Sequence, residues 1–333
     1  MTLVLNAGHI AELIGDVDVI SAVEAVHADL GSGAMTQPAP STLSGSDDAI
    51  FLPMAARSDR FGLAAVKLMA DIPDNGSRGL PTQRSTILVT STVTGECVAV
   101  LDGALVTRLR TAAASAVATR CLARGDSHTL GLIGAGNLAV EHVRAISTVV
   151  PVREIIVWSR SAGTTERFLD SISPELRRRT VVAPDPRRVA VNCDVLCTLT
   201  PSVEPIVRGS WLQPGQHINA VGARPRPTHR ELDAEAMARC TLVVDSAATA
   251  RAKSGDLLQA IADGALPPDA ALRELGEVVS GTTPGRTSRE EITVFNSVGL
   301  AAQDLAVAAA LIDLARLRST GTTVMLSSVP VAV

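Results

Sequence analysis

The spacing of apolar residues divides the chain into stretches with different periods. Residues 7–14 and 17–30 carry apolar side chains at helical spacing, and Gly31 follows the second stretch as a stop signal. Residues 34–122 are richer in strand-forming residues. The clearest strand-like runs there are Leu63–Met69, Ser85–Ser91 and Glu96–Asp102. Small, strongly helix-forming residues fill 104–123, so we expect a closely packed helix there.

From Thr129 onward, short apolar runs alternate with helical stretches. Each run ends at a turn or a polar residue, which is typical of strands buried on both faces. These runs are 128–136, 154–160, 179–184, 194–200, 217–223 and 241–246. Helices are predicted at 141–150 and 298–318, and 267–290 is a Pro-, Gly- and charge-rich excursion. This alternation predicts βαβ units, a parallel sheet and an α/β fold.

Composition narrows the classes of function. The 333 residues suggest two domains, and 46% hydrophobic residues allow a large core. Aromatic residues make up 2% of the chain and the net charge is −4, with no basic block. Such a chain lacks both the stacking platform and the positive surface that nucleic acids require. We therefore expect no nucleic-acid partner.

The cysteines and the start of the chain indicate a reducing compartment. The five cysteines form no regular framework, and Cys193 and Cys197 have no histidine or second cysteine pair near them. We interpret them as small buried hydrophobes and expect no metal site. The first residues lack the basic and apolar regions of a signal peptide, and no apolar run approaches the length of a membrane span. We expect a cytoplasmic protein without a membrane partner.

A glycine-rich segment carries the strongest local motif. Gly134 and Gly136 follow a predicted strand, and Ala139 lies in the helix that comes next. The first glycine permits a tight turn, the second lets the backbone approach a pyrophosphate, and alanine allows close helix–sheet packing. The amino end of the helix then offers N–H groups to the phosphates. The alternative is a plain turn of an α/β fold.

The next strand end bears on the choice of dinucleotide. NAD enzymes usually place an acidic residue there for the ribose 2′-hydroxyl. This chain has Ser159, Arg160 and Ser161 instead, and an arginine pairs with a 2′-phosphate. The segment favours NADPH over NADH, although Arg160 could also be a solvated turn residue. Thr198, Thr200 and Val221 also follow buried strands at their carboxyl ends, where open α/β sheets bind ligands.

Two cations in the other half of the chain stand among apolar residues. Lys67 lies in a predicted strand and Arg110 in a predicted helix of small residues. Such cations usually extend along an apolar surface to reach water, and we expect this for both. The alternative is that they hold a substrate carboxylate or polarise a carbonyl or imine.

The order and spacing of segments along essentially the whole chain resemble the ornithine cyclodeaminase/mu-crystallin family. In the first part the matching residues are Lys67, Asn75, Gly79–Thr82, Thr94–Glu96, Asp102, Gly103, Thr107 and Arg110–Ala113. Later matches are the segments at 131–139, 157–161, 204–223, 230–232, 244–246, 254–256, 274–281 and 294–304.

The resemblance implies a Rossmann dinucleotide-binding domain over 124–299. It also implies an α+β dimerisation and substrate domain, formed by 1–123 with 300–325, and hence a homodimer. The implied chemistry is that of amino acids reacting through an imine, with Lys67 and Arg110 at the substrate's carboxylate or reacting centre. Positions matching dinucleotide contacts are Thr82, Arg110, Asn137, Leu138, Thr200, Val221 and Ser297. Val298, with Gly299 beside it, matches the substrate wall.

Two departures separate the chain from cyclodeaminases within that family. Those enzymes carry a proton-transferring Asp just after the Val-Gly turn, where this chain has Arg224. Many relatives grip the substrate carboxylate with an Arg where this chain has Pro40. Three alternatives follow: Lys67 and Arg110 bind the carboxylate alone, Arg84 or Arg224 substitutes, or the substrate is unusual.

These features together predict an NADPH-dependent reductase of imino acids, with NADH also possible as the coenzyme. The substrate is expected to be a small imino acid, either a cyclic imine carboxylate or an open ketimine. The alternatives are an NAD-dependent ornithine or lysine cyclodeaminase, an amino-acid dehydrogenase, and a non-catalytic binding protein that holds a cofactor and a small ligand.

Overall fold

The chain forms two compact units. The computed structural model describes residues 1–45 and 48–326. The first unit comprises Met1–Arg110 and the chain from Leu300 onward, and the second comprises Thr111–Gly299. Helix α3, Ala104–Leu122, contains the boundary between them.

The first unit is built on a mixed sheet. Its strands are β1 (Thr2–Leu5), β2 (Met35–Thr36), β3 (Leu43–Ser44), β4 (Ile50–Ser58), β5 (Leu63–Asp71), β6 (Gln83–Ser91), β7 (Cys97–Asp102) and β16 (Thr322–Val324). They run in the order β16-β1-β7-β6-β5-β4-β2, with β3 paired to β4. All the pairs are antiparallel except β1 with β7. The predicted strands at Leu63–Met69, Ser85–Ser91 and Glu96–Asp102 are confirmed.

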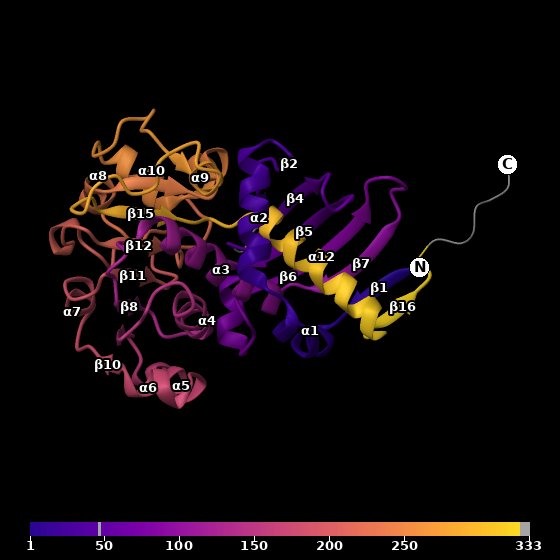
Figure 1. The fold of residues 1–333 in the computed structure, drawn as a ribbon, viewed down its shortest axis with the longest axis horizontal. Helices are drawn as coiled ribbons and strands as arrows, with labels where there is room; N and C mark the ends of the chain where they lie inside the picture. The colour runs from indigo at the N-terminus through magenta and orange to yellow at the C-terminus, as the bar shows by residue number, and fades with distance from the viewer. Residues whose placement is uncertain (46–47, 327–333) are drawn as a thin grey trace. The chain divides into compact units, whose positions relative to one another are not determined.

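Helices cover one face of this sheet. They are α1 (Ala7–Leu13), α2 (Val19–Gly31) and α12 (Ala301–Arg318), with short 3₁₀ turns at Ile14–Asp16 and Pro73–Arg78. Helix α12 packs against α2 and against β4, β5 and β6, as Figure 1 shows. The predicted helices at 7–14 and 17–30 are confirmed. The last helix begins at Ala301 rather than at residue 298, because Gly299 has φ +87° and Leu300 is extended.

The other face of the sheet is apolar and exposed. Side chains alternate along β5, so that Ala65 and Lys67 are buried while Val66 and Leu68 are 43% and 45% exposed. Val66 lies directly opposite Leu88 of β6, which is 40% exposed. We call Val66, Leu68 and Leu88 the outer sheet face.

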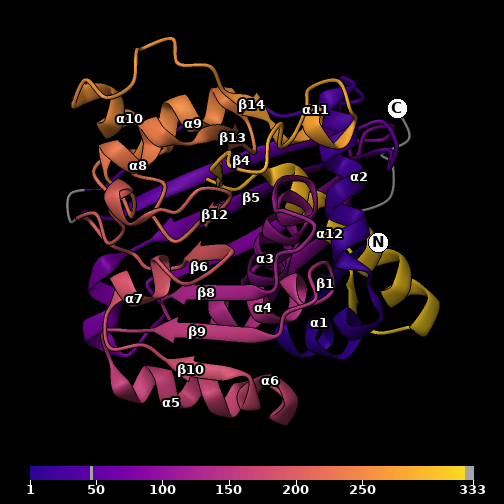
Figure 2. The same cartoon turned by 60° about the vertical axis from the view of Figure 1, so that its left-hand side comes forward.

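The second unit is a parallel α/β sheet. Its strands are β8 (Thr129–Ile133), β9 (Glu154–Trp158), β10 (Thr180–Val182), β11 (Val195–Thr198), β12 (His217–Ala220), β13 (Thr241–Val244), β14 (Arg273–Glu274) and β15 (Thr293–Asn296). Their order is β10-β9-β8-β11-β12-β15-β13-β14, and every pair is parallel. Figure 2 shows β8, β9 and β10 running in the same direction. The chain moves outward from β8 to β10 and then crosses to β11, so the strand order reverses between β8 and β11. Ligands of such sheets bind at this switch point, beyond the carboxyl ends of the strands.

Apolar side chains cover both faces of this sheet. Leu132 and Val157 belong to one core cluster, whereas Ile133 and Ile156 belong to the other. The helices are α4 (Asn137–Ile146), α5 (Ala162–Ser171), α6 (Pro174–Arg178), α7 (Pro186–Ala190), α8 (Ala234–Arg239), α9 (Ala247–Lys253), α10 (Gly255–Ala262) and α11 (Leu275–Val279), with a 3₁₀ turn at Gly209–Trp211. Burial on both faces explains why these strands appear in the sequence as continuous apolar runs.

Most of the strands and helices predicted from Thr129 onward are confirmed, with two corrections. The helix predicted at 141–150 begins four residues earlier, at Asn137, and ends at Ile146. It begins there because Gly136 is its N-cap, so the glycine-rich turn leads into the helix directly. The central strand β15 was not predicted as a strand, since its four residues are too short to show a period.

Candidate functional site

The glycine-rich turn after β8 has the geometry of a phosphate-binding loop. Gly134 has φ +108°, and a Cβ atom there would lie 2.7 Å from the carbonyl oxygen of Leu199. Only glycine fits both conditions. Gly136 is the N-cap of α4, and a Cβ atom there would meet open space. No side chain in the described residues caps this helix end, which leaves its N–H groups available to an anion.

The neighbouring positions are accessible. Asn137, in the first turn of α4, is exposed and Leu138 is half-buried. Ser159, Arg160 and Ser161 connect β9 to α5, and Arg160 and Ser161 are exposed. Ser161 is the N-cap residue of α5, and its hydroxyl makes no capping bond. These five residues form accessible surface around the turn, as a dinucleotide site requires.

A buried carboxyl group joins the loops that follow β11 and β12. Glu231 Oε1 accepts hydrogen bonds from the backbone N–H of Thr200 (2.6 Å) and from its hydroxyl (2.7 Å). Glu231 Oε2 accepts from the Thr198 hydroxyl (2.7 Å) and from the Gly222 N–H (2.8 Å). We call this arrangement the Glu231 clamp. Burial, with a contribution from nearby Asp256, raises the pKa of Glu231 to about 7.

A second buried carboxyl group holds the segment after β15. Asp245 Oδ2 accepts hydrogen bonds from the Ser297 hydroxyl (3.0 Å) and from the N–H groups of Val298 (2.9 Å) and Gly299 (2.6 Å). Three residues assigned to ligand contact by resemblance are therefore held by one side chain. Val221, another of these residues, is half-buried and directly precedes Gly222 of the clamp.

The first unit contains a buried cluster of charged side chains. Lys67 Nζ lies 3.0 Å from Asp304 Oδ1, and Arg110 Nε lies 3.2 Å from the same oxygen. Lys67, Arg110 and Asp304 are 1%, 5% and 0% exposed. The expectation that Lys67 and Arg110 reach water is therefore wrong. Each is buried because Asp304, from the first turn of α12, supplies a counter-charge that the local sequence did not reveal.

The bonds around Lys67 orient it. Lys67 Nζ donates to Thr107 Oγ1 (2.6 Å), which itself donates to the carbonyl oxygen of Gly103. With Asp304 this uses two of the three ammonium hydrogens. Burial lowers the pKa of Lys67 to about 8, and the Asp304 charge opposes that effect.

The cluster carries an excess of positive charge. Two cations and one anion leave a net charge of +1 when Lys67 is protonated. Gln303 accepts from Arg110 (3.0 Å) and contacts His27, whose pKa burial lowers to about 4, so that His27 adds no charge at neutral pH. Asp304 Oδ2 is buried and has no hydrogen-bond partner among the described residues. A bound anion would balance the excess positive charge. A hydrogen-bond donor next to that anion would pair with Asp304 Oδ2.

The remaining predicted positions in the first unit lie on loops or at a strand start. Thr82 is half-buried just before β6, and its carbonyl accepts from Ile72 N. Arg84, one of the suggested substitutes for the family arginine, is exposed on β6. Pro40 is half-buried in the segment that follows Gln37, and Gln37 accepts from Ala302 N at the start of α12 (2.8 Å).

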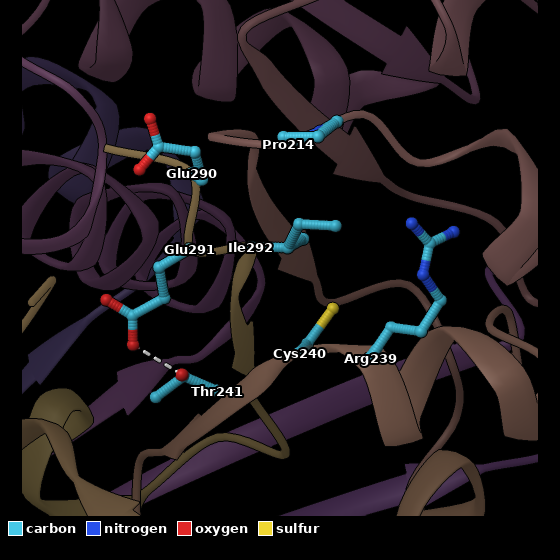
Figure 3. Close-up of a pocket in the computed structure, with 7 residues that line it drawn as sticks. All are labelled: Pro214, Arg239, Cys240, Thr241, Glu290, Glu291 and Ile292. Carbon is cyan, nitrogen blue, oxygen red and sulfur yellow. Dashed lines mark hydrogen bonds between the residues drawn. The ribbon is translucent and has the colours of Figure 1, made fainter. Parts of the chain in front are cut away.

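The second unit also contains a hollow that lies apart from the glycine-rich turn. It has a volume of about 500 Å³ and is lined by Pro214, Arg239, Cys240, Thr241, Glu290, Glu291 and Ile292, as Figure 3 shows. Thr241 begins β13, so the hollow lies at the amino ends of the strands, away from the glycine-rich turn. Two of its polar groups are already engaged: Glu291 accepts from Thr241 (2.5 Å), and Arg239 donates to the carbonyl of Gly209.

Cys193 and Cys197 are buried, as predicted, whereas Cys97, Cys121 and Cys240 are half-buried, and all five are free. Cys193 and Cys197 are 5% and 0% exposed, and burial raises the pKa of both thiols. Within residues 1–45 and 48–326 no group of His, Cys, Asp and Glu has the arrangement of a metal site. No helix in the same ranges is long and apolar enough to cross a membrane.

A parallel sheet with a glycine-rich turn at its switch point defines a protein with a Rossmann-type nucleotide-binding unit, as predicted. Joined to a mixed sheet that buries Lys67, Arg110 and Asp304, it defines a two-unit dehydrogenase-like protein. Residues 1–318 match the ornithine cyclodeaminase/mu-crystallin family, and the chain belongs to that family.

Its relatives include enzymes of imino-acid and amino-acid metabolism. Ketimine reductase mu-crystallin of Rattus norvegicus is 36% identical over 260 residues, which are 78% of this chain and 79% of that protein. The structure of Thermococcus litoralis Δ1-pyrroline-2-carboxylate reductase, with NADH and L-proline, has a TM-score of 0.92 and 31% identity, covering 97% of this chain and all of that one. An archaeal alanine dehydrogenase dimer with bound NAD has a TM-score of 0.90 and 31% identity, covering 98% and 99%.

The carboxyl groups that organise both units were missed by the sequence reasoning. Asp304, Glu231 and Asp245 lie in segments that carry the family resemblance, at 294–304, 230–232 and 244–246. Their roles depend on partners between 9 and 237 residues away, such as Gly222 for Glu231 and Lys67 for Asp304. A carboxylate inside an otherwise apolar segment was the one available signal.

Proposed function

We propose that this protein reduces a small imino acid to the corresponding amino acid with a reduced nicotinamide dinucleotide. The observation that carries the proposal is the buried cluster of Lys67, Arg110 and Asp304 with its net charge of +1. It is supported by the glycine-rich turn of the second unit and by relatives named as a ketimine reductase and a Δ1-pyrroline-2-carboxylate reductase.

The cluster suits a substrate carboxylate. A buried excess of positive charge is costly, and a bound anion relieves it. Arg110 offers a planar set of donors and Lys67 a third ammonium hydrogen that its present bonds do not use. A carboxylate would also favour the protonated form of Lys67, because it adds a second negative charge beside the ammonium group.

Lys67 is also suited to supply a proton. Reduction of a C=N bond adds a hydride to carbon, and the electron pair of the π bond passes to nitrogen, which takes up a proton. An ammonium group with a pKa of about 8 is largely charged at neutral pH and can still release its proton. Asp304 keeps that group charged, so we assign Asp304 to positioning Lys67.

The second unit would hold the dinucleotide. The open space at Gly136 and the uncapped end of α4 fit a pyrophosphate, so these residues suit the coenzyme. When bound, the reduced nicotinamide supplies the hydride. On the family resemblance we propose further contacts from Thr82, Arg110, Asn137, Leu138, Thr200, Val221 and Ser297. Thr198 would act through its loop, since its side chain is buried and bonded to Glu231. Val298 and Gly299 remain proposed substrate positions on the same ground.

We further propose that NADPH is preferred over NADH. Arg160 is exposed beside the hydroxyls of Ser159 and Ser161, and no acidic residue stands at the end of β9. The ratio of kcat/KM with NADPH to that with NADH should exceed 1 and should fall below it in Arg160→Asp. Arg167→Asp is the matched control, because Arg167 is an exposed arginine on α5. A ratio below 1 in the unaltered protein would reverse this assignment.

The decisive experiment is an assay of coenzyme oxidation with imino acids. The substrates are Δ1-pyrroline-2-carboxylate, Δ1-piperideine-2-carboxylate, and pyruvate with ammonia or methylamine. We expect amino-acid formation stoichiometric with coenzyme oxidation, and loss of it in Lys67→Met. No turnover despite tight coenzyme binding would favour a non-catalytic binding protein. Proline formed from ornithine with catalytic NAD would instead show a cyclodeaminase, although Arg224 replaces the acid which that reaction uses.

We propose that the outer sheet face joins two copies of the chain. Val66, Leu68 and Leu88 form an exposed apolar surface on neighbouring strands, and an archaeal relative is described as a dimer. Light scattering should report a dimer for the protein and a monomer for Val66→Glu. Val181→Glu, which alters an exposed valine of the second unit, should leave the dimer intact. A Val66→Glu protein that stays dimeric would contradict this interface.

The expected location is a reducing cytoplasm. All five cysteines are free, including the buried Cys193 and Cys197. Free thiols persist where glutathione and thioredoxin keep them reduced.

A further inference from the structure

We propose that Glu231 is a positioning residue for the coenzyme: its carboxylate fixes the loops after β11 and β12 in the conformation that accepts the dinucleotide. This inference rests on the proposed function, in that a dinucleotide binds to the second unit. It adds a residue outside the phosphate-binding turn. Glu231 lies nine or more residues along the chain from every residue that it holds.

The four donors in the clamp require an ionised carboxylate. Each carboxyl oxygen of Glu231 accepts from one hydroxyl and one backbone N–H, namely Thr200 N at Oε1 and Gly222 N at Oε2. A hydroxyl can rotate to accept a proton, but a backbone N–H cannot. A glutamine would therefore leave one of these two N–H groups facing its amide hydrogens, and a protonated Glu231 would offer one of them only the weaker acceptor of a carboxyl hydroxyl. The backbone of one loop would have to move.

The loops in question form the floor of the switch point. Gly134 of the phosphate-binding turn approaches the carbonyl of Leu199, which lies between Thr198 and Thr200. Gly222 approaches the same loop even more closely, since a Cβ atom there would overlap Thr200 N. A shift of the loop after β11 therefore alters the packing beneath Gly134, and the clamp restrains that shift.

Further bonds hold Glu231 itself in place. Asp256 Oδ1 accepts from the backbone N–H groups of Glu231 (2.8 Å) and Leu232 (2.9 Å), and its Oδ2 accepts from Asn296 (3.1 Å). The position of the carboxylate is thus fixed by α10 and β15 rather than by the loops that it organises. Such support is what pre-organises a binding site.

The charges near the clamp oppose ionisation more than they favour it. Asp256 is the charged group packed against Glu231 and raises its pKa, together with burial. Arg226 and Arg230 lie on the segment that leads to Glu231, and Arg230 pairs with Asp263. Glu231 should thus be half protonated near pH 7, and coenzyme affinity should weaken as the pH falls from 8 to 6.

The test compares Glu231→Gln with Glu235→Gln, an identical change at an exposed position on α8. NADH fluorescence measures Kd between pH 6 and 8, because NADH lacks the 2′-phosphate that titrates in this range. We expect a Kd about tenfold higher for Glu231→Gln at pH 8, with no further rise toward pH 6. The unaltered protein and Glu235→Gln should share one pH-dependent profile. In turnover, KM for the coenzyme should rise while kcat at saturation stays within about threefold.

A Kd within twofold of the unaltered protein for Glu231→Gln at pH 8 would overturn the inference and leave the proposed function standing. Failure of the unaltered protein to bind NADH or NADPH would instead refute the proposed function, and the inference with it. If Glu231→Gln does not fold, Thr198→Val serves in its place. Valine is close to isosteric with threonine and removes one donor from the clamp, so we expect a severalfold rise in Kd. An unchanged Kd would contradict the inference.

Discussion

Replacing Asp304 with asparagine should shift the pH dependence of catalysis rather than abolish it. Asparagine keeps an oxygen that can accept from Lys67 and Arg110, but it removes the negative charge. At 3.0 Å, and with an effective dielectric constant of about 20, the attraction between Lys67 and Asp304 is about 5 kcal/mol. Opposite charges this close typically change a pKa by about 1–3.

The expected size of the effect follows from the Lys67 ammonium group. Its pKa should fall from about 8 to about 6 if the lost charge is worth about 2 pKa units. At about pH 7.5 the protonated fraction then falls from roughly three quarters to roughly 3%, so kcat/KM should drop about 25-fold. Below about pH 5.5 most of the activity should return, because Lys67 is again protonated in the variant.

The assay is kcat/KM for one cyclic imine across that pH range, expressed as the ratio of variant to unaltered protein. The ratio cancels the titration of the substrate itself. Asp313→Asn is the control, because Asp313 is an exposed residue of the same helix. Urea unfolding shows whether both variants are folded. An equal loss of activity at every pH would refute the reasoning, since it would mean that the Asp304 charge does not act through Lys67.

Three further predictions concern the same two units. Lys67→Met should abolish turnover but cost little stability, because it removes a buried charge and keeps much of the side-chain volume. Lys67→Ala should lower the urea midpoint, because it leaves a cavity beside Asp304. Loss of both activity and stability in Lys67→Met would indicate a structural lysine. Gly134→Ala should raise the Kd for NADH at least tenfold, since its Cβ atom would press on Leu199, and calorimetry that detects no change would contradict the packing described. Arg110→Met should raise the KM for the imino acid far more than the KM for pyruvamide with methylamine, because that substrate pair lacks the carboxylate. Equal increases of the two KM values in steady-state assays would show that Arg110 does not bind the carboxylate.

The sequence predicted the features that depend on neighbouring residues. The parallel sheet, the glycine-rich turn and the strands Leu63–Met69 and Ser85–Ser91 could be recognised because periodicity and turn residues are local properties. The start of α4 was misplaced because the glycine motif, and not the apolar period, sets the N-cap. Short strands such as β15 gave no period at all.

The environment of the charged residues could not be predicted from local sequence patterns. Lys67 was expected to reach water, because the general behaviour of a lysine among apolar residues is the best available guide when its partner is unknown. That partner, Asp304, lies 237 residues further along the chain. Glu231 likewise acts on Thr200 and Gly222 through the tertiary fold. Tertiary contacts decide whether a buried charge is tolerated, and they are not encoded in any local pattern.

The position of α12 in the chain has a consequence for synthesis. Helix α12 supplies Asp304 to a unit whose other residues are almost all among the first 110. A nascent chain that has reached Gly299 contains the whole second unit, while Lys67 and Arg110 still lack their counter-ion. The second unit can therefore complete its fold on the ribosome, whereas the cluster of Lys67, Arg110 and Asp304 forms only after α12 has emerged.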